Sequence, residues 1–514
     1  MGANLSGDAT LPKLGTVSPF EQNKRNSDKF APRRFVQYMN LDYARWNEPD
    51  FAEQAVRQIE AGHRIGASGL KEYKRLGLYL RDNDGKLIRI DDPKLDPVWQ
   101  RCGELGLPVS IHVADPVAFW QPYDETNERW TELKDHKSWW FGDPAIFPPH
   151  GQLLDALARV IGKHAGTTFV CVHFGNNPED IDGVDRQLDA HSNMMIDLAA
   201  RVPEIGRGDP AKVRAFFEKH QDRILFATDF MVYDKLILGS GGEGAPPTDQ
   251  DGIDFYEKHW QWLETNDQQM THMTPIQGDW KIDAIGLPAS VLRKIYFDNA
   301  HRLLVRTLPP PTLKGKHIDA DFEIDGTLGN AAWEGAAYAR IDYGIRDGVA
   351  RPELSTGTRV LWSEKYLYLG YSAPFEKLTT FEPARVDGEE ERIGLWERDV
   401  VEAFIGTDPE NVKRYTEYEV APTGEKLDLT LPAKDFAWSS DFAAKVHVNE
   451  EAKVWTTEMR IPLAALAPSV PVIGETVWRL NLYRGCTAEG AFLGWAPTAT
   501  GSAHTPERFG FLEF

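Results

Sequence analysis

Three apolar runs in this sequence each end on a side chain that can bind a metal. Residues 107–111 lead to His112 with Asp115 just beyond, residues 168–172 lead to His173, and residues 223–228 lead to Asp229. Each run predicts a buried parallel strand that delivers its polar residue at its carboxyl end. Carboxyl ends of parallel strands meet on one face of a β/α barrel, so we expect these side chains to converge there. Imidazole and carboxylate together suit zinc or another borderline divalent ion.

This set of residues predicts hydrolytic chemistry. A metal held by His112, His173 and Asp229 would lower the pKa of a bound water toward neutrality. Asp229 is then the expected general base that takes the proton from that water. The alternative interpretation is that each residue is an ordinary polar group at a strand end, satisfied by hydrogen bonds.

Cationic side chains near the same strand ends are candidates for binding a substrate. Lys71 lies at the tip of a predicted strand, where it would bind a substrate carboxylate or, if carboxylated, serve as a further metal ligand. Arg201 and Arg207 follow the strand at 193–197 and would clamp a carboxylate, although a structural ion pair is an equal alternative.

Residues 114–150 form a long connection with eight aromatic side chains, which is too aromatic for a disordered segment. We interpret it as a wall over the site and assign Trp120 and Arg129 to substrate binding. The alternative is an excursion that packs only on itself.

Strand and helix patterns alternate through the first 308 residues, which predicts right-handed βα units and a parallel sheet. Residues 1–34 are polar and are predicted to be a loop, and residues 35–308 form the barrel-type domain. Its six predicted strands lie near residues 34–41, 69–80, 108–112, 168–172, 193–197 and 223–230. A complete barrel needs eight strands.

The pattern changes after this domain. Residues 309–316 begin with three prolines and predict a stiff linker. Residues 317–514 then show short strand patterns separated by turn residues, which predicts an antiparallel all-β sandwich.

Composition narrows the function classes. The chain has 514 residues and a formal charge of -21, which argues against binding to nucleic acids or anionic membranes. Its three cysteines are too few for a disulfide framework, and no apolar run reaches membrane-spanning length. Residues 1–24 lack the apolar core of a signal peptide. The sequence does not decide the cellular compartment, because a truncated chain would lack the true N-terminus.

The first domain resembles the metal-dependent amidohydrolase superfamily, and within it amidohydrolase-related family 2. The resemblance rests on motifs around Lys71, His112, Arg129, His173, Asp197 and Asp229, and on Phe297-Asp298-Asn299-Ala300. It implies that His112 and Asp229 bind the metal and that His173 binds, orients or activates the metal water. It also implies a small-molecule substrate.

One departure from the family pattern stands out. The family opens with His-x-His on its first strand, and this sequence contains no His-x-His. We therefore expect the barrel domain to be incomplete at its N-terminus, and metal binding and activity to be weakened or lost. A truncated chain is favoured over a natural variant that lost two βα units, because an open barrel exposes sheet edges.

The second domain resembles a family-9 carbohydrate-binding module. Motifs around Trp333, Trp362, Glu458 and Trp478 carry the resemblance, together with the run from Trp396 to Ile405. It implies a sugar held between aromatic faces with charged groups on its hydroxyls. The candidates are Trp396, Glu402, Arg484 and Trp495, and the alternative is that both tryptophans belong to the core.

Three functions fit the sequence. The first is a metal-dependent hydrolase of a carbohydrate-derived ester, lactone or amide, with an attached sugar-binding module. The second is a non-catalytic carbohydrate-binding protein with a degenerate barrel. The third is a decarboxylase or hydratase on the same metal scaffold.

Overall fold

The computed structural model describes residues 2–8, 18–31, 34–242, 244–385, 391–408 and 411–514. The chain divides into two compact units, Met1–Leu308 and Pro309–Phe514. No described helix is both long enough and apolar enough to cross a membrane.

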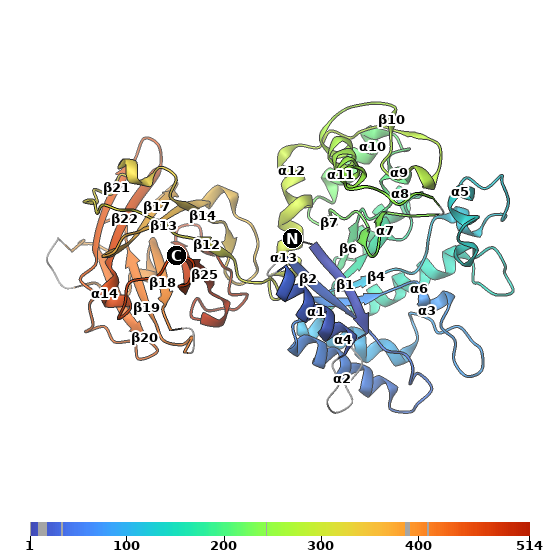
Figure 1. Cartoon of the computed structure of the whole chain (residues 1–514), viewed down its shortest axis with the longest axis horizontal. Coiled ribbons are helices and arrows are strands. Elements are labelled where there is room, and N and C mark those ends of the chain that lie inside the picture. The colour runs from blue at the N-terminus through green and yellow to red at the C-terminus, as the bar shows by residue number, and fades with distance from the viewer. Residues whose placement is uncertain (1, 9–17, 32–33, 243, 386–390, 409–410) are drawn as a thin grey trace. The chain divides into compact units, whose positions relative to one another are not determined.

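The first unit is built on a parallel sheet whose strands follow one another in chain order (Figure 1). Among the described residues this sheet has seven strands and is open, with β1 and β7 at its two edges. The α/β barrel-type fold predicted from the sequence is therefore confirmed. The strands are β1 Gly2–Asp8, β2 Phe35–Asn40, β3 Gly69–Glu72, β4 Val109–Ile111, β5 Phe169–Cys171, β6 Met194–Asp197 and β7 Ile224–Leu225.

Helices follow the strands and pack on the sheet (Figure 1). The longer ones are amphipathic, and their apolar sides join the strands in one core. They are α1 Pro19–Phe30, α2 Phe51–Arg64, α3 Arg75–Leu78, α4 Asp96–Leu105, α5 Trp130–Leu133, α6 His150–Lys163, α7 Val172–Gly175, α8 Ile181–Ala190, α9 Val202–Ile205, α10 Pro210–Lys219, α11 Asp249–Glu264, α12 Ala289–Arg293 and α13 Asn299–Leu304.

The prediction that residues 1–34 form a loop is wrong, because this segment contains β1 and α1. Helix α1 is polar on most of its surface, and Phe20 is its buried residue. Its stability comes from local features: Ser18 caps the first turn by accepting from the Glu21 N–H, and Arg25 pairs with Glu21 one turn away. Strand β1 pairs with β2 through the main chain, without an apolar pattern in its sequence.

The free edge of β7 is covered by the closing helical segment. The Phe226 N–H donates to the carbonyl of Ile295, which lies in the π-helical turn η5 Lys294–Asp298. The Asn299 side-chain amide donates to the Ile224 carbonyl at 2.7 Å. These bonds satisfy main-chain groups that a neighbouring strand would otherwise pair with.

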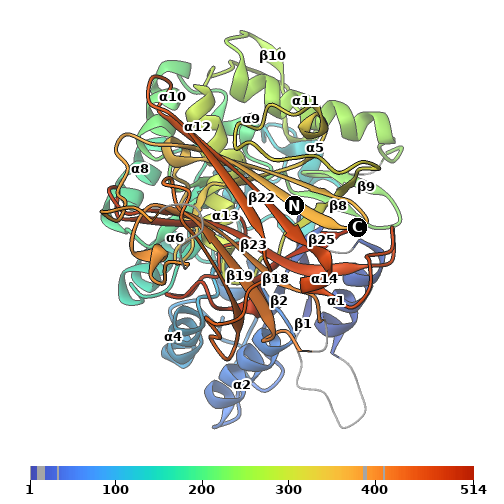
Figure 2. The same cartoon turned by 90° about the vertical axis from the view of Figure 1, so that its left-hand side faces the viewer.

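The described residues of the second unit form two β-sheets, as the sequence predicts, and their strands are visible in Figure 2. Most pairs are antiparallel, and β12 with β25 and β13 with β16 are parallel. One sheet contains β12 Thr312–Lys314, β15 Tyr343–Gly344, β18 Val400–Gly406, β19 Tyr415–Val420, β20 Lys426–Leu431, β23 Val477–Cys486, β24 Ala491–Gly494 and β25 Gly510–Glu513. The other contains β13 Lys316–His317, β14 Ala337–Ile341, β16 Thr356–Trp362, β17 Tyr366–Pro374, β21 Ala443–Asn449 and β22 Val454–Pro462.

The sheet that contains β18 is buried on both faces. Val401 and Ala403 belong to the core that also includes Trp455 of the other sheet. Val400 and Phe404 belong to a separate cluster on the outer face. Because side chains alternate along a strand, neighbouring residues of β18 enter different cores.

Candidate functional site

The exits of β4 and β5 bring two buried histidines into contact. His112 directly follows β4, and His173 lies in the turn α7 directly after β5. Their ring centroids are 4.3 Å apart and the rings are inclined at 62°. The predicted convergence of strand-end histidines is therefore present for this pair.

The turn that carries His173 has an unusual backbone. His173 adopts the left-handed conformation with φ 56°, which costs a non-glycine residue on the order of 1 kcal/mol. Its main-chain N–H donates to Asp197 at 2.8 Å, and its Nδ1–H donates to the Ala199 carbonyl at 2.7 Å. The second bond leaves the Nε2 lone pair free to accept a proton or bind a metal.

Both imidazoles are held in the neutral form. Burial lowers the pKa of His112 to about 4, against the opposing effect of Asp115. Burial, and then the nearby His112 and Arg201, hold the pKa of His173 well below its usual value. Neutral imidazoles can act as bases or as metal ligands near neutral pH.

Asp115 joins the histidine pair to two cations. It contacts His112 Nε2 at 3.2 Å, forms an ion pair with Lys74, and lies 3.5 Å from a guanidinium nitrogen of Arg201. Burial would raise the pKa of Asp115, but Lys74, His112 and Arg201 together hold it well below its ordinary value. Asp115 is therefore an anion that fixes positive charge beside His112.

The aromatic segment 114–150 is anchored at this point. The Lys74 ammonium lies 6.0, 5.1 and 5.5 Å from the ring centroids of Phe119, Trp139 and Phe141. Trp120 donates to the Pro148 carbonyl at 2.9 Å, so its indole is also engaged within the segment. Many of these rings pack on one another, as the self-packed alternative predicts. Lys74 also connects them to Asp115 beside His112, which agrees with a wall next to the site.

Lys71 is a buried cation with no paired anion. It is 4% exposed, and among the described residues its Nζ makes no hydrogen bond or ion pair. Its Nζ lies 5.5 Å from the Tyr73 ring centroid. Burial lowers its pKa, while Asp197 and Asp229 act in the opposite direction. An unpaired buried ammonium is costly, which favours an anionic ligand beside it.

Asp229 follows β7 after three residues, so the predicted long strand is reduced to Ile224–Leu225. Asp229 itself has φ 59°. Burial raises its pKa, and Lys71 and Arg201 oppose the rise. Burial also raises the pKa of Asp197 to about 6. Lys71 therefore influences both carboxylates and both histidines, which places these groups around one centre.

The donor types at this centre fit a divalent ion, since they include two neutral imidazoles and a carboxylate. Their spacing is less complete. Among the described residues, the one group of three His, Cys, Asp or Glu side chains with ligand atoms within 4.8 Å of one another is Asp185, Asp189 and His220. His112 and His173 thus meet each other, while Asp229 does not complete such a group.

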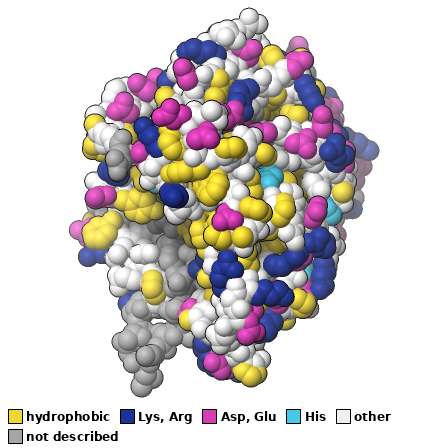
Figure 3. Space-filling view, turned by 90° about the vertical axis from the view of Figure 1, so that its right-hand side faces the viewer, with side chains coloured by type: hydrophobic (Ala, Val, Ile, Leu, Met, Phe, Trp, Pro, Cys, Tyr) yellow, Lys and Arg dark blue, Asp and Glu magenta, His cyan; other side chains and the backbone are white. Residues whose placement is uncertain are grey.

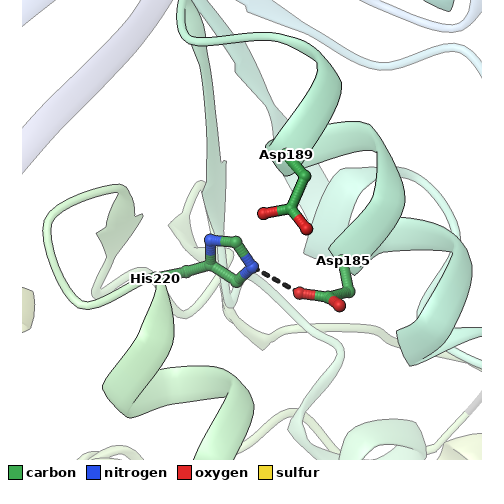
Figure 4. Close-up of side chains that lie close together, drawn as sticks. All are labelled: Asp185, Asp189 and His220. Carbon is green, nitrogen blue, oxygen red and sulfur yellow. Dashed lines mark hydrogen bonds and ion pairs between the residues drawn. The ribbon is translucent and has the colours of Figure 1, made fainter.

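Figure 4 shows the group that meets this spacing, with His220 bonded to Asp185. His220 contacts Asp185 at 2.6 Å, and Lys219 bridges Asp185 and Asp189 at 2.7 Å each. An ammonium between the two carboxylates takes the place that a cation would take. We therefore interpret this group as a surface ion-pair network.

Two predicted substrate-binding arginines lie in structural ion pairs. Arg207 contacts Glu128 at 3.0 Å and stacks on Trp280, with 4.2 Å from its guanidinium to the ring. Arg129 is fully buried between Glu132 and Glu204. Their charges are paired within the protein, which for Arg207 is the structural ion pair that the sequence left as the alternative to substrate binding.

Lys74 and Asn176 were not assigned to the site from the sequence. The Asn176 side-chain oxygen accepts the Val113 N–H at 2.7 Å, and its amide donates to the Ile111 carbonyl at 3.3 Å. This bridge fixes the exit of β4, and hence His112, relative to the turn after β5. The one sequence signal for this bridging role is that Asn176 lies three residues after His173. Its contact with Val113 could not be predicted, because no spacing rule places these two residues opposite each other.

In the second unit, Glu402 and Arg484 lie on opposite faces of their sheet. Glu402 pairs with Tyr483, and Val401 pairs with Arg484, so Arg484 shares the face of Val401. The guanidinium of Arg484 lies 5.1 Å from the Trp455 ring centroid in the inter-sheet core. The prediction that Glu402 and Arg484 act on one sugar is therefore not supported by the register.

The two candidate tryptophans also differ. Trp396 is 45% exposed in the turn η8 Leu395–Glu397. Trp495 is half-buried, packs against the inter-sheet core, and has its ring so close to Gly510 that a Cβ there would lie 2.6 Å from it. Trp396 has the exposed face that a sugar needs, whereas the indole of Trp495 is used in packing.

Three buried glutamates gather on the outer face near this turn. Glu402 pairs with Glu419 across β18 and β19, and Glu417 pairs with Phe404 on the same face. Burial raises the pKa of Glu417 to about 7. Burial, then the neighbouring glutamates, raise the pKa of Glu402 and Glu419 well above the usual value. Among the described residues no ion pair neutralises these three glutamates, so they retain protons more strongly than ordinary carboxyls.

Family comparisons cover both units. A family model described as Amidohydrolase matches residues 31–306, and one described as Carbohydrate family 9 binding domain-like matches residues 324–514. A protein described as an extracellular protein of Arthroderma benhamiae is 27% identical over 154 residues, which cover 27% of this chain and 67% of that protein.

Two solved structures illustrate the likeness of each unit. An amidohydrolase from Mycobacterium avium subsp. paratuberculosis K-10 is 16% identical, with a TM-score of 0.31, over 56% of this chain and 63% of that one. A family 9 carbohydrate-binding module from Caldicellulosiruptor kristjanssonii, solved with cellotriose, is 15% identical, with a TM-score of 0.31, over 39% of this chain and 92% of that one.

The buried glutamates predict a pH dependence of stability. A carboxyl whose folded-state pKa is raised favours folding when protonated, so its contribution is present below the unfolded pKa and is lost as pH rises through the folded pKa. Between pH 5 and pH 8 we expect the second unit to lose on the order of 2 kcal/mol of unfolding free energy. Urea unfolding, followed by hydrogen exchange in β18 to β20, measures it.

The Glu419→Gln variant should remove part of this loss, because an amide does not ionise. Glu475→Gln, a change at an exposed glutamate of the same unit, is the matched control and should leave the pH dependence unchanged. Equal stability of the unmodified chain at pH 5 and pH 8 would contradict the assignment.

Proposed function

Since the chain belongs to the amidohydrolase family, whose model matches residues 31–306, we propose that its α/β unit is a metal-dependent hydrolase of a carbohydrate-derived ester, lactone or amide. The observation that carries the proposal is the contact between two neutral histidines at the strand exits, 4.3 Å apart, beside the unpaired ammonium of Lys71. This arrangement supplies bases, metal donors and a positive charge in one buried place.

We assign the metal to His112, His173 and Asp229, and the expected ion is zinc. His173 offers Nε2 because its Nδ1 is engaged with the Ala199 carbonyl. Such an ion, when bound, supplies Lewis acidity and a water of lowered pKa. Since the family's His-x-His pair is absent from this sequence, we expect the affinity to be weak.

The remaining steps fall to the chain's own side chains. Asp229, whose pKa is raised by burial, takes the proton of the attacking water and can return it to the leaving group. Lys71 is placed to stabilise the negative charge that develops on the carbonyl oxygen, because its ammonium has no internal partner among the described residues. Arg201 and Lys74 hold Asp115 in place beside His112.

A substrate carboxylate fits the same charge pattern. Arg201 Nε is buried without a hydrogen-bond partner, and its NH1 donates only to the neighbouring Ala200 carbonyl. This arginine therefore has donor capacity left, and it is not enclosed between two glutamates as Arg129 is. Among the arginines predicted from the sequence, Arg201 is the one we propose for substrate binding, together with Lys71 and, at the wall, Trp120.

For the second unit we propose carbohydrate binding through the exposed face of Trp396 with Glu402 behind it. The family model over residues 324–514 supports this proposal. The packing of Trp495 and Arg484 removes them from the proposed platform. A single exposed indole contributes on the order of 1 kcal/mol by stacking, so we expect weak binding of mono- or oligosaccharides.

The competing function is a non-catalytic sugar-binding protein whose barrel has lost its metal. Both proposals share the second unit and differ in the α/β unit. Zinc content after dialysis and hydrolysis of a panel of aldonolactones and acetylated sugars separate them.

The histidine pair generates a prediction about activity. His112→Ala and His173→Ala should each reduce hydrolysis by about 100-fold or more, because each removes a base or metal donor that no neighbour replaces. Zinc bound to the full chain, measured by elemental analysis, should fall in the same variants.

His63→Ala is the matched control, since His63 lies on α2 away from the strand exits, and it should change neither quantity. Hydrolysis by His112→Ala at the rate of the unmodified chain would refute the catalytic assignment. If a variant loses zinc but keeps its rate of hydrolysis, the proposed role of the metal is refuted, while the hydrolase assignment stands.

The two tryptophans generate a prediction about sugar binding. Trp396→Ala should weaken binding of glucose and cello-oligosaccharides about fivefold while leaving stability within about 0.5 kcal/mol, because its face is exposed. Trp495→Ala should instead lower the unfolding free energy by about 2 kcal/mol through lost packing.

Calorimetric titration of the full chain and urea unfolding measure these effects. If Trp396→Ala binds sugar unchanged and Trp495→Ala loses binding while its stability is unchanged, the assignment of the two residues is reversed.

A further inference from the structure

A cavity of about 400 Å³ lies in the α/β unit between α3, the connection after it, and α6. We propose that it binds a small amphipathic carboxylate, with an aromatic or alkyl body inside and the anion at the rim. The site is separate from the proposed catalytic centre. Its volume falls in the ordinary range for small-molecule sites.

The floor of the cavity is apolar and buried. Leu76, Ile90, Val113 and Leu153 line it and are at most 6% exposed, and Ala156 adds a small side chain from α6. Transferring an apolar group from water onto such a floor is favourable by about 25 cal/mol for each Å² buried. The floor therefore favours the hydrocarbon part of a ligand.

Three cationic side chains line the rim of the cavity. Arg81, Lys86 and Arg89 line the cavity, and its described lining residues include no Asp or Glu. Figure 3 faces the side of this unit with α3, α5 and α6, where hydrophobic side chains gather in the middle and charged side chains of both signs lie around them. The cationic lining of the cavity contrasts with the chain's formal charge of -21.

Two of the three rim cations, Arg81 and Lys86, form no ion pair with a described residue. Arg89 is offset by Asp91, which it contacts at 2.8 Å. Arg81 donates only to neutral acceptors, the Gly85 and Ile146 carbonyls at 2.8 and 3.2 Å. The Lys86 Nζ makes no hydrogen bond or ion pair with a described residue, while the Lys86 main-chain N–H donates to the Asp82 carboxylate at 2.9 Å. Arg81 and Lys86 are thus available to a carboxylate at the mouth.

The mouth is also fixed in position. The bond from Arg81 to the Ile146 carbonyl joins the connection after α3 to the proline-rich segment 144–149, which forms the opposite wall. Gly77 approaches Leu153 so closely that a Cβ would lie 2.8 Å from its Cδ2. A wall held on both sides limits the reorganisation that binding requires.

Val113 separates this cavity from the histidine pair. It lines the floor, whereas the neighbouring His112 does not. Binding here therefore does not depend on the metal or on the catalytic assignment, and the test can be read independently of both.

The test compares 2-naphthoate with the neutral 2-naphthalenemethanol on the full chain by isothermal titration calorimetry. Naphthoate should bind about three- to tenfold more tightly, the range expected for rim charges. In the double variant Arg81→Gln/Lys86→Gln this preference for the acid over the alcohol should disappear. Ala156→Leu, which fills the floor, should weaken both probes.

A double change with the same charge difference, Arg64→Gln/Lys134→Gln, is the matched control and should keep the preference, since both residues are exposed and outside the cavity. The proposal is overturned if the alcohol binds as tightly as the acid. It is also overturned if Arg81→Gln/Lys86→Gln, whose exposed positions make folding defects unexpected, retains the preference.

Discussion

The carboxylate of Asp197 is the constraint on which the proposed catalytic centre depends. One of its oxygens accepts the main-chain N–H of His173 at 2.8 Å and that of Ala199 at 3.2 Å. The first of these bonds holds a left-handed residue in place, and the Ala199 carbonyl then orients the imidazole. A single side chain at the end of β6 thus sets the backbone after β5 and the tautomer of its histidine.

Charge organises the rest of the centre. Four cations surround the strand exits: Lys71, Lys74, Arg75 and Arg201. Asp115 forms ion pairs with Lys74 and Arg201, and Glu72 forms one with Arg75. Lys71 is left over, beside two carboxylates whose pKa values burial has raised. Because a buried ammonium without an ion-pair partner is costly, acids and their lactones or esters are the compounds to test first at this centre.

Much of this arrangement was predictable from the sequence, because strand-end residues follow from apolar runs. His112 and His173 were placed correctly, since a parallel sheet brings consecutive strand ends together. Asp229 was placed less well, because its run forms only a short strand and three residues of connection follow it. The partners of Arg129 were hidden, since Glu204 is far away in sequence.

Register and local capping explain the remaining differences. Arg484 and Glu402 fall on opposite faces because of a one-residue offset between paired strands, which a single sequence does not reveal. Helix α1 was missed because its apolar pattern is weak, although Ser18, Pro19 and Glu21 carried a start signal. The second-unit fold was predictable because its short strands alternate regularly and turn residues separate them.

The helical segment that covers β7 has a consequence for self-association. A bare edge of a parallel sheet is a template on which a strand from another molecule can grow. In this protein the Asn299 amide and the Ile295 carbonyl occupy that template. Protection of this edge against fibre-like stacking therefore depends on one helical turn staying docked. Conditions that detach the turn should promote aggregation before the core of the unit unfolds.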